Sequence, residues 1–133
     1  RFYWSPGVPR EVVEKAMCNS FCFGLYDDDT GAQIGYARVM TDFATSAYLA
    51  DVYVLSAYRG TGLGVWLIDC VVNAPPLHGI RSFYLATRDA HGLYEKFGFK
   101  TPDDPKHIMV ARYEMPWYRS NLAETHEQDL AHE

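Results

Sequence analysis

The sequence has no long hydrophobic run and no cluster of basic residues. None of its apolar stretches approaches the roughly 20 residues of a membrane-spanning helix. Lysine and arginine are dispersed along the 133 residues, which carry a formal net charge of -5. A surface that binds nucleic-acid phosphates needs a basic patch or stripe. We therefore expect neither a membrane nor a nucleic acid among the partners of this protein.

Cysteine is also scarce, with three residues at Cys18, Cys22 and Cys70. An odd number without a secretory leader predicts free thiols in a reducing compartment, and hence a cytoplasmic location. No histidine or further cysteine completes a zinc-binding set, so we expect no metal and interpret all three cysteines as small core residues. The chain begins at Arg1 rather than methionine, which predicts that a native N-terminal segment precedes it.

What the sequence does contain is typical of one globular domain. Apolar residues make up 48% and aromatic residues 15% of the chain, which suits a single hydrophobic core at this length. We assign residues 1–120 to the domain and residues 121–133 to a polar C-terminal tail.

Hydrophobic periodicity and turn residues predict the order of the elements. Helices are expected over residues 9–19, from the glycine-rich segment to Pro75, and over 89–97 with Asp89 as N-cap. Strands are expected over residues 21–26, 33–40, 47–54 and 80–86, at Phe99, and over 108–115. A solvated hairpin turn over residues 27–31, which includes Asp27, is expected between the first two strands. Hairpins followed by a strand–helix–strand unit predict an α/β (α+β) fold, in which a mixed twisted sheet is flanked by helices.

A glycine-rich segment follows the third strand and opens a helix. Its residues are Arg59, Gly60, Thr61, Gly62, Leu63 and Gly64. Glycine lets backbone N–H groups approach a phosphate, and the first turn of a helix adds unpaired N–H groups and a favourable dipole. The segment does not match the dinucleotide-binding fingerprint G-x-G-x-x-G, because the last glycine of that motif would fall on Val65. It does not match the Walker A motif either, because no Gly-Lys-Ser/Thr follows. The segment therefore predicts a diphosphate site, unless it is only a tightly packed turn.

Arg59-x-x-Gly62-x-Gly64 and, further along the chain, residues 90–99, AHGLYEKFGF, form two short motifs. They resemble the R/Q-x-x-G-x-G/A signature and the A-x-x-L-Y-E-K-x-G-F segment, respectively, of the GNAT superfamily of N-acetyltransferases. The resemblance implies that acetyl-CoA is the co-substrate, bound in a cleft where two sheet strands splay apart. The implied pyrophosphate-binding residues are Arg59, Gly60, Thr61, Gly62, Leu63, Gly64 and Val65. The implied pantetheine-binding residues are Val52, Tyr53, Val54, Tyr94 and Thr87, the last standing where the family often has asparagine, which could weaken that contact.

The resemblance also suggests catalytic residues. Tyr94 matches the family's tyrosine near the leaving thiolate; because full proton transfer from a tyrosine to a thiolate is uphill by roughly 2 kcal/mol, hydrogen-bond donation is its expected role. A core aromatic is the alternative for Tyr94. Asp51 is the candidate general base, with an anchor for the acceptor amine or a structural partner for a buried arginine as alternatives. His91 and a water chain to bulk solvent are the other candidate bases. A backbone N–H from Val52 or its neighbour would polarise the thioester carbonyl.

The sequence says least about the substrate that accepts the acetyl group. Phe2-Tyr3-Trp4 and residues 42–45 could wall an acceptor pocket, or the aromatic run could pack the first helix onto the sheet. We expect acetyl transfer to a primary amine of a small molecule or amino acid, by direct attack in a ternary complex. A non-catalytic acyl-CoA-binding sensor or interaction module and a protein or peptide N-acetyltransferase are the alternatives. Exposed strand edges near the C-terminus would allow a homodimer.

Overall fold

The computed structural model of this protein describes residues 7–117. Its helices and strands are α1 (Arg10–Cys18), β1 (Phe21–Tyr26), β2 (Gln33–Thr41), β3 (Ser46–Val54), α2 (Leu63–Val72), β4 (Ser82–Leu85) and α3 (His91–Glu95). Three single-turn 3-10 helices, η1 (Ser56–Tyr58), η2 (Pro75–Leu77) and η3 (Pro105–His107), lie between and after them. The aromatic run Phe2-Tyr3-Trp4 and the expected tail over 121–133 lie outside the described residues.

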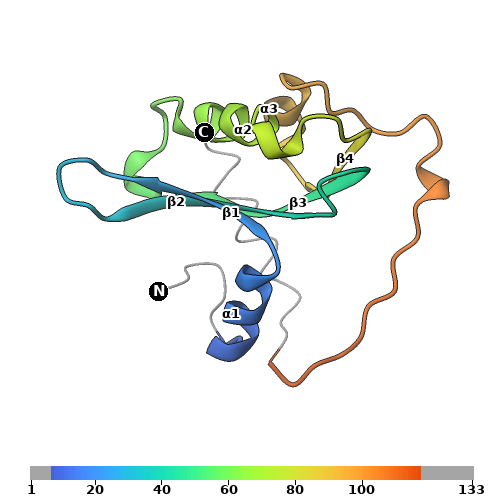
Figure 1. Cartoon of the computed structure of the whole chain (residues 1–133), viewed down its shortest axis with the longest axis horizontal. Coiled ribbons are helices and arrows are strands. Elements are labelled where there is room, and N and C mark those ends of the chain that lie inside the picture. The colour runs from blue at the N-terminus through green and yellow to red at the C-terminus, as the bar shows by residue number, and fades with distance from the viewer. Residues whose placement is uncertain (1–6, 118–133) are drawn as a thin grey trace.

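The four strands form one mixed sheet in the order β1-β2-β3-β4 (Figure 1). β1, β2 and β3 pair antiparallel as a meander, and β4 pairs parallel to β3 after the crossover through α2. The hairpin turn expected over residues 27–31 is present: Gly31 N–H donates to Asp27 O at 2.7 Å, and Gly31 takes the left-handed φ of +74° that favours glycine. The predicted fold class is confirmed.

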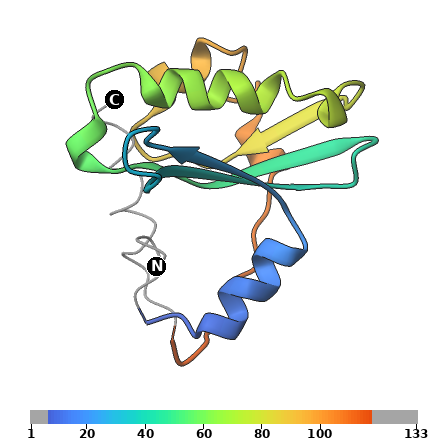
Figure 2. The same ribbon diagram turned by 60° about the vertical axis from the view of Figure 1, so that its left-hand side comes forward.

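α2 and α3 lie on one side of the sheet, and α1 projects from the other side (Figures 1 and 2). The main core lies between the sheet and α2, because alternate residues of β2 and β3 point toward the apolar face of that helix. Fully buried members of this core are Ala37, Val39, Val54, Ile68 and Val71. Among the described residues, no helix is long and apolar enough to cross a membrane.

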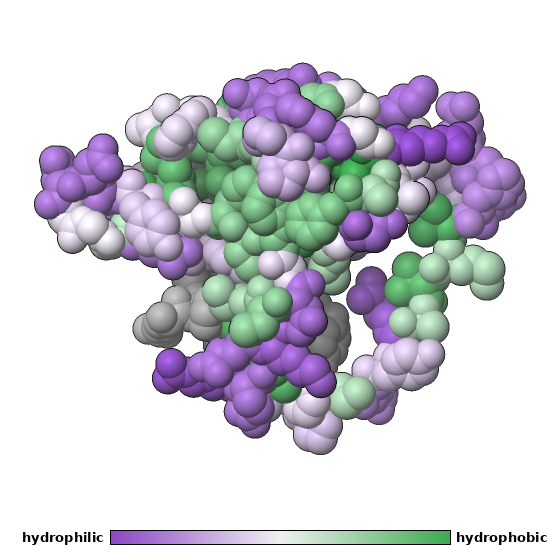
Figure 3. Space-filling model, in the orientation of Figure 1, coloured by the Kyte–Doolittle hydropathy of each residue, from purple (hydrophilic) through white to green (hydrophobic). Residues whose placement is uncertain are grey.

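The strands expected at Phe99 and over residues 108–115 are wrong, since β4 is the last strand of the described part. Phe99 packs instead as an aromatic side chain, with its ring 5.5 Å from that of Phe83. Residues 108–115 leave the sheet as an extended, exposed segment, with Met109 91% exposed (Figure 3). β-favouring residues form a strand only beside a partner edge, and this segment has none within residues 7–117.

Two smaller predictions also need correction. Asp89 does not cap the last helix: α3 begins at His91, and Thr87 Oγ1 accepts the N–H of Ala90 at 3.0 Å just before it. The N-cap position is Ala90, with no side-chain cap hydrogen bond, so Asp89 stands one residue before the position that a cap would need. Cys18 and Cys70 are exposed rather than core residues, because they fall on the outer faces of α1 and α2; all three cysteines are free thiols.

Candidate active site

A tight loop joins the end of β3 to the start of α2. After η1 the chain turns at Gly60 and Gly62, whose φ angles of +79° and +83° are left-handed. Gly62 is the N-cap of α2. A Cβ added at either glycine would meet nothing within 4 Å. The two glycines are therefore required by the backbone turn and not by close packing, and the space in front of the loop stays open.

The end of α2 presents donors to that space. The first helical bond runs from Trp66 N–H to Gly62 O at 3.0 Å, so the N–H groups of Leu63, Gly64 and Val65 point out of the helix end. Arg59 lies along the same loop, where its Nε donates to Val54 O at 3.1 Å. Positive charge and outward N–H groups make this loop suited to an anion.

Other contacts fix the loop from outside. The Thr61 hydroxyl donates to Tyr58 O at 2.9 Å within the loop. Tyr58 OH donates to Asp27 Oδ2 at 2.9 Å and so ties the loop to the β1–β2 hairpin. This hydrogen bond from Tyr58 holds the pKa of the Asp27 carboxyl below its usual value. Sequence reasoning placed Asp27 only in a solvated turn, and no local pattern indicates a partner 31 positions away.

β3 carries a bulge in the middle of its pairing with β2. Tyr36 pairs with Tyr53 and Arg38 with Ala50, so the single residue between them on β2 faces both Asp51 and Val52. Asp51 has a φ of +56°. A bulge whose first residue is left-handed bends the strand and increases its twist. The pairing of β2 with β3 therefore contains a bulge, and Asp51 forms it together with Val52.

The sheet opens directly beyond this point. The last parallel pair of β3 and β4 is Leu49 with Leu85, where β4 ends. β3 continues to Val54, with β2 on one side and no strand on the other within the described residues. Val52, Tyr53 and Val54 therefore lie where the two strands have parted, and the chain runs from there into the glycine loop.

Asp51 has a charged partner. Its Oδ2 accepts from Arg38 Nε at 2.6 Å, and the two side chains are only 25% and 15% exposed. Arg38 also donates to Ser20 Oγ at 3.1 Å. Of the three roles that the sequence left open for Asp51, a partner for a part-buried arginine is the one whose contact is present in this structure.

Tyr94 lies near the other side of the opening. It is 5% exposed, belongs to the same apolar cluster as Val52, and packs edge to face with Phe99 at 5.9 Å between ring centroids. It also lines a cavity of about 260 Å³ beyond the end of β4. Thr87 and His91 line the same cavity, and His91 is exposed. Tyr94 is thus a core aromatic that also reaches a hollow.

The loop over residues 42–45 lies at the opposite end of β3 from the glycine loop. Asp42 accepts the N–H of Thr45 at 2.7 Å and the N–H of Ala44 at 2.9 Å. Hydrogen bonds from Thr45, first from its hydroxyl, hold the pKa of the Asp42 carboxyl far below its usual value. The Asp42 side chain is therefore engaged in its own turn, and the Phe43 ring packs 5.6 Å from that of Phe21. A role for this loop in acceptor binding stays a prediction.

Comparison with known proteins places this geometry in a family. A family model described as an acetyltransferase (GNAT) domain matches residues 19–101. The chain is 31% identical to FG08082, a candidate acetyltransferase of Gibberella zeae, over 86% of this chain and 76% of that protein. Among solved structures, a candidate GNAT acetyltransferase of Xanthomonas campestris pv. campestris is 44% identical, with a TM-score of 0.76 over 83% of this chain and 76% of that one.

A GNAT-family acetyltransferase from Elizabethkingia anophelis, solved with acetyl-CoA bound, shares the fold at 15% identity. Its TM-score is 0.58, over 71% of this chain and 63% of that chain. The matched residues 19–101 run from just before β1 to just beyond α3 and include both motifs. The chain therefore belongs to the GNAT acetyltransferase family.

Proposed function

We propose that this protein transfers an acetyl group from acetyl-CoA to a primary amine of a small molecule or amino acid, by direct attack in a ternary complex. The observation that carries the proposal is the parting of β3 and β4 immediately beside the glycine loop. An elongated ligand with an anionic end can then lie along β3 and end at α2. The acetyl-CoA of the Elizabethkingia neighbour supports this choice of ligand.

The residues of the loop fit the coenzyme. Open space in front of Gly60 and Gly62 leaves room for a diphosphate. The N–H groups at the start of α2 and the Arg59 guanidinium supply donors and positive charge. Val52, Tyr53 and Val54 would offer backbone groups to the pantetheine arm, as an added strand does. Thr87 and Tyr94 line the hollow beyond β4.

The proposed reaction needs a neutral amine, a polarised carbonyl and a stabilised leaving group. The protonated amine gives one proton to solvent water, its neutral nitrogen attacks the thioester carbon, and the C–N bond forms as charge builds on the oxygen. The nitrogen then gives a second proton to water, which leaves a neutral amide when the carbonyl forms again. A backbone N–H at Val52 would stabilise that oxygen. The C–S bond then breaks, the electron pair goes to sulfur, and Tyr94 would donate a hydrogen bond to the thiolate.

Release of free coenzyme A thiol from acetyl-CoA across a panel of primary amines tests the proposal. The panel contains small amines, polyamines, amino acids and a lysine peptide, and calorimetry measures coenzyme A binding in parallel. We expect binding together with amine-dependent thiol release. Binding without release by any amine would favour a non-catalytic acyl-CoA binder, and release only by the peptide would favour a peptide N-acetyltransferase.

We also propose a homodimer in the cytoplasm. Five large apolar side chains of the extended segment are at least 47% exposed: Ile108, Met109, Val110, Tyr113 and Met115. β4 is an edge strand of the described sheet. An exposed apolar segment and an open edge are the features that favour self-association. The three free thiols support a reducing compartment.

A further inference from the structure

We infer that the Arg38–Asp51 ion pair positions the bulge of β3, and that Asp51 is a positioning residue rather than the proton acceptor. The inference rests on the proposed acetyl transfer, since it concerns the backbone of Val52 that would polarise the thioester. Four features of the structure support it: the φ of Asp51, the direction of its side chain, the anchoring of Arg38 and the place of the bulge.

The backbone of Asp51 is in a conformation that few residues adopt. Its φ of +56° is left-handed, and apart from glycine it is mainly asparagine and aspartate that tolerate that region. Such a conformation persists when surrounding contacts hold it. The contact here is the 2.6 Å bond from Arg38 Nε to Asp51 Oδ2.

Asp51 and Val52 point to opposite faces of the sheet. Ala37 and Val39 belong to the core cluster on the α2 side, so Arg38 between them points to the α1 side. Asp51 meets Arg38 on that side, whereas the Val52 side chain belongs to the core cluster. The Asp51 carboxylate therefore binds Arg38 on the α1 side of the sheet, away from the side chain of Val52.

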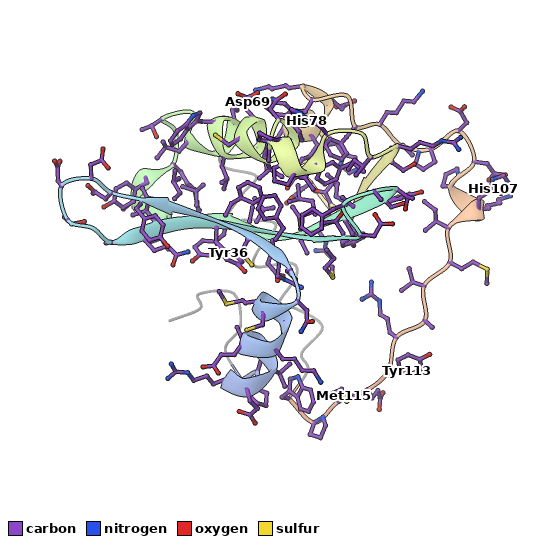
Figure 4. The ribbon with its side chains drawn as sticks, viewed as in Figure 1. Tyr36, Asp69, His78, His107, Tyr113 and Met115 are labelled. Carbon is purple, nitrogen blue, oxygen red and sulfur yellow. The ribbon has the colours of Figure 1, made fainter. Side chains whose placement is uncertain are left out.

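Arg38 is itself held from α1. Its Nη1 donates to Ser20 Oγ at 3.1 Å, and the Ser20 hydroxyl donates to Ala16 O at 2.7 Å at the end of that helix. Tyr36, whose ring packs 6.1 Å from that of Tyr53, lies on the same side of β2 (Figure 4). A chain of hydrogen bonds thus runs from α1 through Arg38 to Asp51.

This chain ends where the strands part. The last β3–β4 pair is at Leu49, and the bulge is at Asp51 and Val52. Because a bulge redirects the strand, the ion pair sets the direction in which the backbone of Val52 enters the opening. Losing the pair would move the polarising group while leaving the glycine loop intact.

Three substitutions at one position separate positioning from proton transfer. Asp51→Asn keeps an oxygen for Arg38 and tolerates the left-handed φ, Asp51→Gly keeps only the φ, and Asp51→Ala keeps neither. We expect kcat to fall in the order Asn, Gly, Ala, by roughly 3-fold for Asn and more than about 30-fold for Ala, with little change in coenzyme A affinity and an unchanged pH profile of kcat/KM. Loss of a general base would instead lower all three variants alike, by roughly 100-fold or more, and change the pH profile.

The matched control is Glu14→Ala. Arg10 and Glu14 form a 2.7 Å ion pair of the same type on the exposed side of α1, away from any bulge. We expect no effect of that change on kcat. Equal loss of activity in Asp51→Asn, Asp51→Gly and Asp51→Ala would overturn the inference.

Amide hydrogen exchange separates a failure of this inference from a failure of the proposed function. Exchange at Val52 and its β3 neighbours needs no acceptor amine, so it can be measured even if no amine is acetylated. We expect protection near the native level in Asp51→Asn and faster exchange, limited to the bulge, in Asp51→Ala and Arg38→Ala. Unchanged protection in Asp51→Ala and Arg38→Ala would show that the ion pair does not hold the bulge.

Discussion

Tyr58 and Asp27 join two loops that are far apart in the sequence. The hydrogen bond between them lowers the pKa of Asp27 and raises that of Tyr58. Since the folded pKa of Asp27 is below its unfolded value near ~3.9, the contact stabilises the fold fully above that pH and is lost as the pH falls through the folded pKa. The pair holds the loop that precedes Gly60 against the hairpin.

Tyr58→Phe should therefore destabilise the protein in a pH-dependent way. We expect a lower Tm than that of the native protein at pH 7, and a smaller difference at about pH 3, where Asp27 is becoming protonated. Thermal unfolding followed by circular dichroism measures both. Tyr26→Phe, at an exposed position of β1, is the control. An equal Tm difference at the two pH values would contradict this account.

Tyr94 is buried and is also one of the residues that line the hollow beyond β4. Tyr94→Phe keeps the edge-to-face packing on Phe99 and removes only the hydroxyl donor. A hydrogen bond to a charged partner contributes about 1.5–3 kcal/mol, so we expect kcat to fall roughly 10- to 100-fold while coenzyme A affinity stays within about 2-fold.

Steady-state thiol release and calorimetry measure the two effects of Tyr94→Phe. Tyr113→Phe, on the extended segment far from the sheet, is the control (Figure 4). Native turnover by Tyr94→Phe would show that this tyrosine is only a core aromatic.

At the scale of elements, the β3–α2 connection depends on left-handed glycines. Gly62 caps α2 at φ +83°, so the N–H groups of the first turn keep their direction only while that angle is kept. An alanine there must either adopt the left-handed region, at a cost of about 1–2 kcal/mol, or change the turn.

Gly62→Ala should therefore weaken coenzyme A binding about 10-fold or more, with a modest fall in Tm. Gly92→Ala is a matched control, because Gly92 lies inside α3, has no positive φ and has nothing within 4 Å of an added Cβ. That control should bind coenzyme A normally and be equally or more stable, since alanine favours helix. Equal binding by both variants would show that the turn does not orient the site.

Most of the elements were predictable because their signals are local. The spacing of apolar residues and the Asp27–Gly31 turn predict α1, β1 and β2 to within about two residues. The strand expected over residues 108–115 failed because strand pairing depends on a partner edge elsewhere in the chain. The prediction of Asp89 as N-cap failed for a different reason, since α3 begins one residue later, with Ala90 at the N-cap position and no side-chain cap hydrogen bond.

At the scale of the whole molecule, the sheet lies between α1 on one side and α2 and α3 on the other (Figure 2). The described segment beyond η3 forms no helix or strand and runs away from the sheet. Apolar side chains along that segment are exposed (Figure 3). Exposed apolar surface of this kind favours association.

The proposed homodimer predicts a solution mass twice the 15.2 kDa of one chain. Size-exclusion chromatography with light scattering measures it. Replacing Ile108 and Val110 together by lysine should shift the mass toward the monomer, because charges oppose burial of that segment. As a control, a double replacement of the exposed Arg10 and Lys15 by alanine should leave the mass unchanged. A native protein that is monomeric at high concentration would contradict the proposal.

The sequence by itself determined the glycine loop between β3 and α2, the order of the elements through α3 and the family. These depend on glycine, on apolar periodicity and on short motifs whose parts lie close along the chain. Only the tertiary structure decided the partners of Asp51 and Asp27, the bulge, and where β3 and β4 part. Each of these features depends on contacts between residues of different strands or loops. Strand register and sheet twist set the distances of those contacts, and no local sequence pattern predicts them.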